Sequence, residues 1–219
     1  MDAPTKTFRE KTAAHLIKHL GKRGMEASYA PTISQARAEV LAMIPSPASV
    51  IRCGTESVGS MGLWADIAAL PGVTLIDPYE PGITPDEGMA RRTKGLMADV
   101  MIASTNAITL DGKLVNLDGL GNRVAGMCFG PKKVILVVGL NKVAGTLEAA
   151  MDRVRTFAAP MNSLRLAASF PDPKPPCTED GRCHQCMNPN KICNMWVIIE
   201  GQKFKDRLHV KLVGEDLGY

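Results

Sequence analysis

The chain has 219 residues, of which 45% are hydrophobic, and a net charge of +4, so it can bury a sizeable core in a single domain. No apolar run approaches the ~20 residues that span a bilayer, and the N-terminus lacks a signal-peptide pattern, which predicts a cytoplasmic protein with no membrane partner. The basic residues form no concentrated run with interleaved aromatic residues, so we expect no nucleic-acid partner, and the small positive surplus favours a small anionic ligand.

The first half of the chain alternates between segments of helical hydrophobic spacing and short β-prone runs. The expected helices are residues 5–24, 34–44, 60–70 and 86–96. The expected strands are residues 25–30, 49–53, 73–77 and 100–103. This alternation is typical of an α/β fold with a parallel sheet.

After residue 103 the pattern changes. Asp111 and Gly112 separate two β-prone runs, and such a pair favours the tight turn of a hairpin. A short helix, the strongest strand pattern of the chain and a long amphipathic helix follow, and two final β-prone runs are expected to pair with each other. These elements are residues 107–110 and 113–117 for the hairpin, 133–138 for the strand, 143–158 for the helix, and 196–200 and 209–213 for the final strands.

Four of the six cysteines lie within a seventeen-residue window near the C-terminus: Cys177, Cys183, Cys186 and Cys193. Thiolates bind zinc and iron–sulfur clusters, and a Cys-x2-Cys pair brings two sulfurs to one metal centre without backbone strain. Proline, glycine and asparagine residues fill the segment 171–195 and favour turns. We therefore predict a Cys-rich metal-binding segment attached to a single domain that spans residues 1–219.

The spacing of these cysteines does not decide between zinc and an iron–sulfur cluster, because it matches neither a two-pair zinc ribbon nor the bacterial ferredoxin pattern. Two disulfides or unconnected thiols are the alternatives to a metal centre. His184 is expected to be a neighbour of the centre or an exposed residue, and not a fifth ligand. Cys53 and Cys128 are expected to be buried core thiols.

Two glycine-rich loops follow predicted strands, at the edge where open α/β sheets bind their ligands. In the first loop, Gly54, Ser57 and Gly59 would let backbone amides approach a phosphate or carboxylate. The loop lacks the complete P-loop and dinucleotide-binding patterns. A plain strand-to-helix turn remains the alternative.

The second loop carries two glycines, two polar turn residues and an arginine, which can hold an anion bidentately. Its predicted ligand-binding residues are Gly119, Gly121, Asn122 and Arg123, with Asn106 from the preceding strand end. Replacing Arg123 with methionine is expected to abolish ligand binding and to leave the fold intact. The alternative is that Asn122 and Arg123 cap secondary structure and pair with Asp118.

No catalytic triad and no metalloprotease pattern is legible in the sequence. Glu56 and Asp111 are weak candidates for a general acid or base, and a helix start and a hairpin turn explain them equally well. His15 and His19 lie four residues apart on the first helix without a carboxylate or cysteine neighbour in sequence, so we interpret them as surface residues.

Residues 103–123, 129–134 and 213–219 resemble the LUD domain (lactate utilisation) family, and the resemblance covers nearly the whole chain. It implies an α/β three-layer sandwich similar to the NagB, ribose-5-phosphate isomerase (RpiA) and CoA-transferase group. The cysteine segment resembles that of a small stand-alone branch of the family. The chain departs from lactate-operon members at residues 104–109, where a glutamate of the family string is replaced. This departure also fits poorly with CoA-transferase chemistry, which needs a nucleophilic glutamate at a strand end.

The resemblance implies a role in 2-hydroxy-acid (lactate-type) redox metabolism beside an iron–sulfur electron-transfer partner protein, and it favours a [4Fe–4S] cluster over zinc. A second reading is a non-enzymatic accessory subunit with a structural zinc clip. A third is an isomerase or hydrolase of a sugar phosphate with Glu56 or Asp111 as its base. Whether the protein is an enzyme, and whether it forms a homo-oligomer, stay open at this point.

Overall fold

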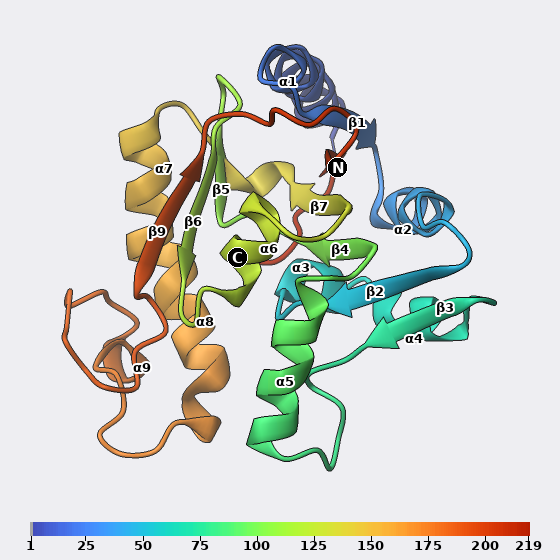
Figure 1. The fold of residues 1–219 in the computed structure, drawn as a ribbon. Coiled ribbons are helices and arrows are strands. Elements are labelled where there is room, and N and C mark those ends of the chain that lie inside the picture. The colour runs from blue at the N-terminus through green and yellow to red at the C-terminus, as the bar shows by residue number, and fades with distance from the viewer. Residues whose placement is uncertain (1) are drawn as a thin grey trace.

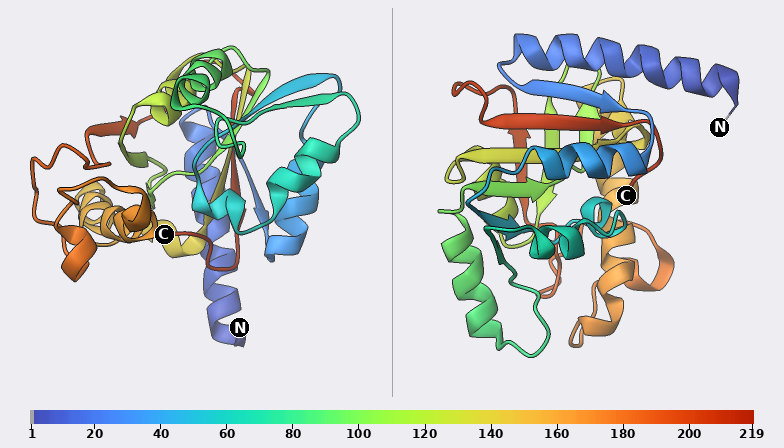
Figure 2. Two further views of the ribbon diagram at one scale, coloured as in Figure 1. Left: turned by 90° about the horizontal axis from the view of Figure 1, so that it is seen from below. Right: turned by 90° about the vertical axis from the view of Figure 1, so that its right-hand side faces the viewer.

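A computed structural model describes residues 2–219 of the chain. Its centre is a six-stranded sheet with the strand order β1-β10-β7-β4-β2-β3, in which every pair of neighbours is parallel. The strands are stacked beneath the N-terminal helix in the right-hand view of Figure 2. They are β1 (Glu26–Ala30), β2 (Ala48–Arg52), β3 (Val73–Ile76), β4 (Val100–Ala103), β7 (Lys133–Gly139) and β10 (Leu208–Val213).

Both faces of this sheet are covered. On the central strand β7, Leu136 belongs to the apolar cluster of one face and Ile135 to that of the other, as the two-residue period of a strand requires. One cluster includes α1 (Ala3–Lys22) and α6 (Asn122–Cys128), with α5 (Pro85–Gly95) beside them on β2. The other includes α2 (Ile33–Ala42), α3 (Glu56–Gly59) and α4 (Leu63–Ala69).

A second sheet of four strands, in the order β8-β5-β6-β9, packs on the α1 side. Its strands are β5 (Ala107–Thr109), β6 (Leu114–Asp118), β8 (Val143–Ala144) and β9 (Met195–Ile199). Figure 1 shows α7 (Leu147–Arg153) and α8 (Ala159–Leu166) on the outer side of this sheet. A π-helical turn, η2 (Val154–Ala158), joins these two helices, and their apolar residues form a third cluster with the sheet.

The α/β fold class, the parallel central sheet and the hairpin at residues 107–117 are confirmed. The predicted pairing of the two final strands is wrong. β10 lies inside the central sheet between β1 and β7, whereas β9 is an edge strand that pairs with β6. β10 is buried along nearly its whole length and β9 only at its end, so each strand suits its own position.

Two further expectations need correction. The predicted helix over residues 143–158 begins only at Leu147, because Val143 and Ala144 pair with β5 and Thr146 caps the helix. The thiol residue Cys128, expected in the core, is exposed at the end of α6, whereas Cys53 is buried.

The remaining short elements are three: η1 (Leu140–Lys142), η3 (Ala167–Ser169) and α9 (Cys177–Asp180). His15 and His19 lie side by side on α1, with ring centroids 4.3 Å apart. Within residues 2–219, none of the helices combines the length and the hydropathy that a membrane crossing requires.

Candidate functional site

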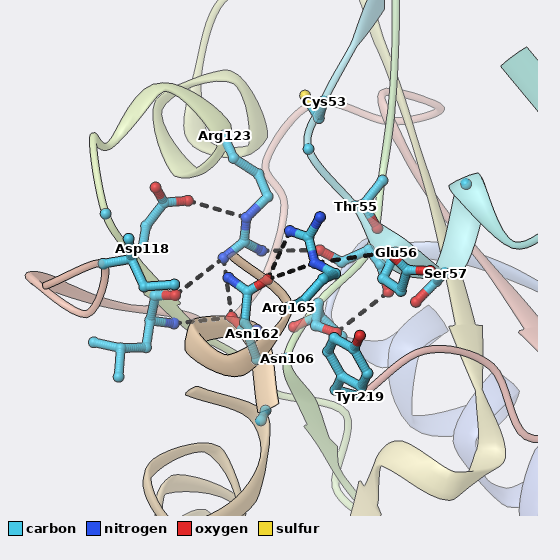
Figure 3. A pocket seen from close by; sticks show the side chains of 18 of the residues that line it. Cys53, Thr55, Glu56, Ser57, Asn106, Asp118, Arg123, Asn162, Arg165 and Tyr219 are labelled. Carbon is cyan, nitrogen blue, oxygen red and sulfur yellow. Dashed lines mark hydrogen bonds and ion pairs between the residues drawn. The ribbon is translucent and has the colours of Figure 1, made fainter. Parts of the chain in front are cut away.

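A pocket of about 380 Å³ opens at the carboxyl edge of the central sheet. The ends of β2, β4 and β7 contribute its floor, and the second sheet and α8 contribute its opposite wall. Figure 3 shows Glu56 and Ser57 across the pocket from Asp118 and Arg123, with Arg165 of α8 between them. Parallel α/β sheets bind their ligands at this edge.

Both glycine-rich loops reach this pocket. Gly121 and Asp111 do not: Gly121 adopts φ = 88° before α6, against the Met195 side chain, and Asp111 lies in the hairpin turn. Asp111 is paired there with Arg23, at 2.7 Å, and its pKa is lowered chiefly by a hydrogen bond from Thr109. The predicted residues that line the pocket are Gly54, Glu56, Ser57, Gly59, Asn106, Gly119, Asn122 and Arg123.

Arg123 holds the floor of the pocket together. Its Nη1 donates to the carbonyl oxygen of Ser104 (2.9 Å) and to Asn116 Oδ1 (2.8 Å). Its Nη2 donates to Asn106 Oδ1 (2.9 Å) and to the carbonyl oxygen of Leu117 (3.3 Å). Four of its five N–H groups are therefore used inside the protein, and Arg123 positions its neighbours more than it offers donors to a ligand.

Asp118 completes this cluster from the end of β6. Its Oδ1 accepts a hydrogen bond from the backbone N–H of Gly121, and its Oδ2 lies 3.0 Å from Arg123 Nε. That second contact is close but not aligned for hydrogen bonding, so Oδ2 is a buried acceptor without a donor among residues 2–219. This oxygen is fully buried, so Asp118 serves the pocket through its contacts with Arg123 and with the Gly121 amide.

Two further arginines face the pocket from opposite sides. Arg52, at the end of β2, donates to Asp77 Oδ2 (2.8 Å) and lies over the rings of Trp64 and Tyr79. Arg165, on α8, is about one-third exposed, and its Nε is 3.7 Å from the Glu56 carboxylate. That separation exceeds hydrogen-bonding distance. Arg165 Nε and Nη2 donate to Asn162 Oδ1 (3.1 and 2.7 Å), so the other N–H groups of the guanidinium can bind an anion in the pocket.

Close packing at the end of β2 explains one of the predicted glycines. A Cβ at Gly54 would lie 2.5 Å from Tyr79 Oη, so any larger residue would displace the Tyr79 ring from the pocket wall. Burial raises the pKa of the neighbouring Cys53 thiol to about 12, which makes it a poor nucleophile.

The pocket also contains a lysine that the sequence did not suggest. Lys142, in the turn η1 after β7, is only 3% exposed. Burial, followed by the charges of Arg153 and Arg123, lowers the pKa of its amine to about 7. No motif surrounds Lys142, and the available signal was its place directly after an apolar strand that ends at the ligand-binding edge.

The four clustered cysteines line a second, smaller cavity of about 50 Å³ behind α8. All six cysteines of the chain fall in the described part and are free thiols. Burial raises the pKa of Cys193, and the nearby thiols of Cys183 and Cys186 raise it further. Arg155 and Lys191 also line the cavity and would offset the negative charge of thiolate ligands.

These cysteines fit a metal centre in their chemistry and their convergence. Within residues 2–219, however, no group of three or more His, Cys, Asp or Glu side chains has the arrangement of a single-ion site. A zinc ion with ~2.3 Å bonds needs its sulfurs about 4 Å apart, whereas a [4Fe–4S] cluster binds each sulfur to a different iron. The four thiols and the basic side chains beside them are the groups that such a centre would use.

One helix separates the two cavities. Asn162 and Arg165 of α8 face the pocket, whereas Ala159 and Ser163 of the same helix face the cysteines. The segment before β9 also contacts both cavities. Ile192 lines the pocket, and the adjacent Cys193 lines the cysteine cavity.

Residues 13–213 match the LUD domain family. The protein belongs to the LUD domain family. A crystal structure of a DUF162 family protein from Deinococcus radiodurans is similar to this LUD domain over 94% of the chain and 98% of its own, with a TM-score of 0.50 and 16% identity. No curated protein matches the chain.

Two further structures resemble about half of this LUD domain. One is a D-ribose-5-phosphate isomerase in complex with phospho-erythronic acid, with a TM-score of 0.34 and 13% identity over 51% of the chain and 53% of its own. The other is eIF2B delta from Chaetomium thermophilum, with a TM-score of 0.35 and 16% identity over 56% of the chain and 54% of its own.

Proposed function

We propose that this LUD domain binds a small anionic metabolite in the pocket at the carboxyl edge of its sheet. The observation that carries the proposal is the convergence of both glycine-rich loops with Arg52, Arg165 and Lys142 on one pocket. The pocket also contains Arg123 and two carboxylates, Glu56 and Asp118, so basic side chains outnumber acidic ones. A pocket with this balance attracts a carboxylate or a phosphate.

The polar groups of the pocket favour an anion that also carries a hydroxyl. Arg165 is positioned for the anionic group, and the partly exposed Glu56 carboxylate, which lines the same pocket, is an acceptor for a hydroxyl. A 2-hydroxy acid has both groups on adjacent atoms. This combination supports a link to 2-hydroxy-acid (lactate-type) redox metabolism.

We propose that Cys177, Cys183, Cys186 and Cys193 hold a [4Fe–4S] cluster. The support is that the four thiols line one cavity with basic neighbours and that the resemblance to the LUD family favours an iron–sulfur cluster over zinc. When bound, such a cluster would supply one-electron redox chemistry. The chain's own contribution is to fix four thiolates and to surround them with Arg155 and Lys191.

The shared wall of the two cavities supports a redox connection between them. Residues of α8 line both cavities, and the adjacent residues Ile192 and Cys193 line one cavity each. An iron–sulfur partner protein would then exchange electrons with the cluster from outside. In this proposal the pocket selects the metabolite and the cysteine segment connects it to an electron carrier.

Calorimetric titration tests anion binding. L-lactate, glycolate and ribose 5-phosphate are titrated into the protein, and lactamide serves as the matched neutral control for lactate. At least one of the anions is expected to bind, and lactamide is expected to bind much more weakly than lactate if lactate is bound. Failure of all three anions, or equal binding of lactate and lactamide, would contradict the proposal.

Anaerobic purification tests the cluster. Brown protein with about four iron atoms and four sulfides per chain is the expected result. Colourless protein with one zinc per chain would instead support the structural clip. Metal-free protein that takes up neither iron nor zinc would remove the metal centre altogether.

A further inference from the structure

Lys142 is the most deeply buried basic side chain of the pocket. Its Nζ lies 2.7 Å from Ser57 Oγ, 3.1 Å from Ser104 Oγ and 3.3 Å from the carbonyl oxygen of Thr105. The first neighbour comes from α3 and the other two from the end of β4. Three polar atoms from two elements therefore hold the amine in one position at the pocket floor.

The nearest charges do not compensate a positive charge on Lys142. Arg153 on α7 and Arg123 on α6 are the charged groups that act on it, and both are cationic. No carboxylate of residues 2–219 forms an ion pair with Lys142. The carboxylates on the surrounding elements have other partners. In the pocket, Glu56 faces Arg165 and Asp118 faces Arg123. Near the C-terminus, Asp216 pairs with Arg9, and Glu215 accepts from the backbone N–H of Ile33.

The neighbours of Lys142 can satisfy either protonation state. Ser57 Oγ also lies 3.3 Å from the carbonyl oxygen of Leu217, and Ser104 Oγ lies 3.3 Å from that of Thr105. When Lys142 is charged, both hydroxyls can accept from the ammonium and donate to these carbonyls. When Lys142 is neutral, one hydroxyl can turn and donate to the nitrogen lone pair.

We propose that Lys142 is a neutral amine in the empty pocket and takes up a proton when a small anion binds. The incoming anion supplies the negative charge that the surrounding protein lacks, and the two serine hydroxyls rotate to accept from the new ammonium. The ligand class is a small carboxylate or phosphate of fixed charge. This inference rests on the proposed anion binding, to which it adds proton coupling.

The proton coupling makes affinity depend on pH in a defined direction. Burial already brings the pKa of Lys142 to about 7, and an opposite charge within ~4–6 Å raises such a value by about 1 to 3 units. Binding at pH 8 then takes up about half a proton or more per anion. Affinity is expected to fall as the pH rises from 7 to 9.

The first experiment follows Lys142 itself. Protein with ¹³C-labelled lysine is titrated by NMR without added anion, and then with saturating sulfate or oxalate, whose charges do not change above pH 5. The Lys142→Met protein assigns the signal. A midpoint near pH 7 that rises with either anion is expected, and an empty-pocket midpoint above pH 9 would overturn the inference.

The second experiment measures protons by calorimetry of the same two anions in buffers of different ionisation enthalpy at pH 8. Lys132→Met, which changes an exposed lysine paired with Asp99, is the matched control and is expected to keep full proton uptake. Binding without proton uptake would overturn the inference and leave the anion site standing. If neither anion binds even at high concentration, the inference and the proposed anion site both fail.

Discussion

The pocket and the cysteine cavity share one wall, but they are held in shape by different means. The pocket floor is made from the ends of sheet strands and from Arg123, which bonds to four acceptors. The cysteine segment has no buried residue in α9, and its turns depend on Asn188 and Asn190, which donate to proline and lysine carbonyls. The fold therefore preorganises the pocket, whereas the cysteine segment relies on turn hydrogen bonds and, in our proposal, on its bound cluster.

Removing one cysteine should produce the largest difference between the two regions, because it should affect the cysteine segment and not the pocket. Cys186→Ser is expected to lose nearly all bound metal and to increase hydrogen exchange across residues 171–195, because four-ligand centres contribute folding free energy directly. Exchange in the central sheet should stay unchanged. Iron analysis and hydrogen-exchange mass spectrometry measure both effects.

The matched control for that change is Cys128→Ser, since Cys128 is exposed at the end of α6 and lies outside both cavities. It should keep its metal. Full metal content in Cys186→Ser would mean that the ligand assignment is wrong.

Arg123→Met should destabilise the folded protein and thereby disrupt the pocket. The substitution leaves the buried Asp118 and Asn116 and the half-buried Asn106 without their cationic partner, which costs about 3–5 kcal/mol in the free energy of unfolding. The sequence suggested that this variant would keep its fold intact, and the buried contacts change that expectation. Urea denaturation measures the loss.

The comparison for Arg123 is Arg37→Met, which removes an exposed arginine paired with Asp66. Surface pairs of this kind contribute at most about 1 kcal/mol. If the two variants were equally stable, Arg123 would not be stabilising the pocket floor.

Lys142→Met should alter stability in a pH-dependent way. The pKa of Lys142 falls from 10.5 in a solvated amine to about 7 in the fold, so burying the charged form destabilises the protein fully below pH 7. This penalty fades as the pH rises towards 10.5. The stability of the variant relative to the parent should therefore decrease by roughly 3 kcal/mol from pH 6 to pH 9.

Urea denaturation at several pH values measures that difference. A constant difference across this range would show that Lys142 titrates alike in the folded and unfolded chains. Lys132→Met again provides the control, because this exposed side chain has no burial to relieve.

Arg165→Met should have the smallest effect on stability and act on binding alone. Its contact with Glu56 is long and partly exposed, so the free energy of unfolding should change by less than about 1 kcal/mol. The affinity for the anion should fall about tenfold, or ~1.4 kcal/mol, since a charge-assisted contact is lost. Calorimetry with an anion that binds the parent checks this, and unchanged affinity would remove Arg165 from the site.

The sequence predicted those parts of the molecule that depend on local patterns. Strand β7 and the hairpin turn at Asp111 and Gly112 follow from apolar runs and turn chemistry, and the cysteine window was visible from spacing alone. The two glycine-rich loops could also be located, because each follows a strand-like run.

Long-range pairing was not accessible in the same way. β10 inserts between β1 and β7, which are distant in sequence, and no local pattern specifies these neighbours. For the same reason, the sequence could not predict that hydrogen bonds within the protein occupy the Arg123 guanidinium or that Lys142 is buried. Both depend on residues that the tertiary fold brings together from separate strands and helices.

The π-helical turn at Val154–Ala158 sets which face of α8 points toward the pocket and which face points toward the cysteines. Pro160, just after it, lacks the N–H that a regular α-helix would use, and π turns accommodate such a break. Each residue turns an α-helix by about 100°, so deleting one residue here would turn α8 by about that angle. Arg165 would leave the pocket and the face beside the cysteines would change together. Insertions and deletions at this turn therefore act on both cavities at once, while the helix content hardly changes.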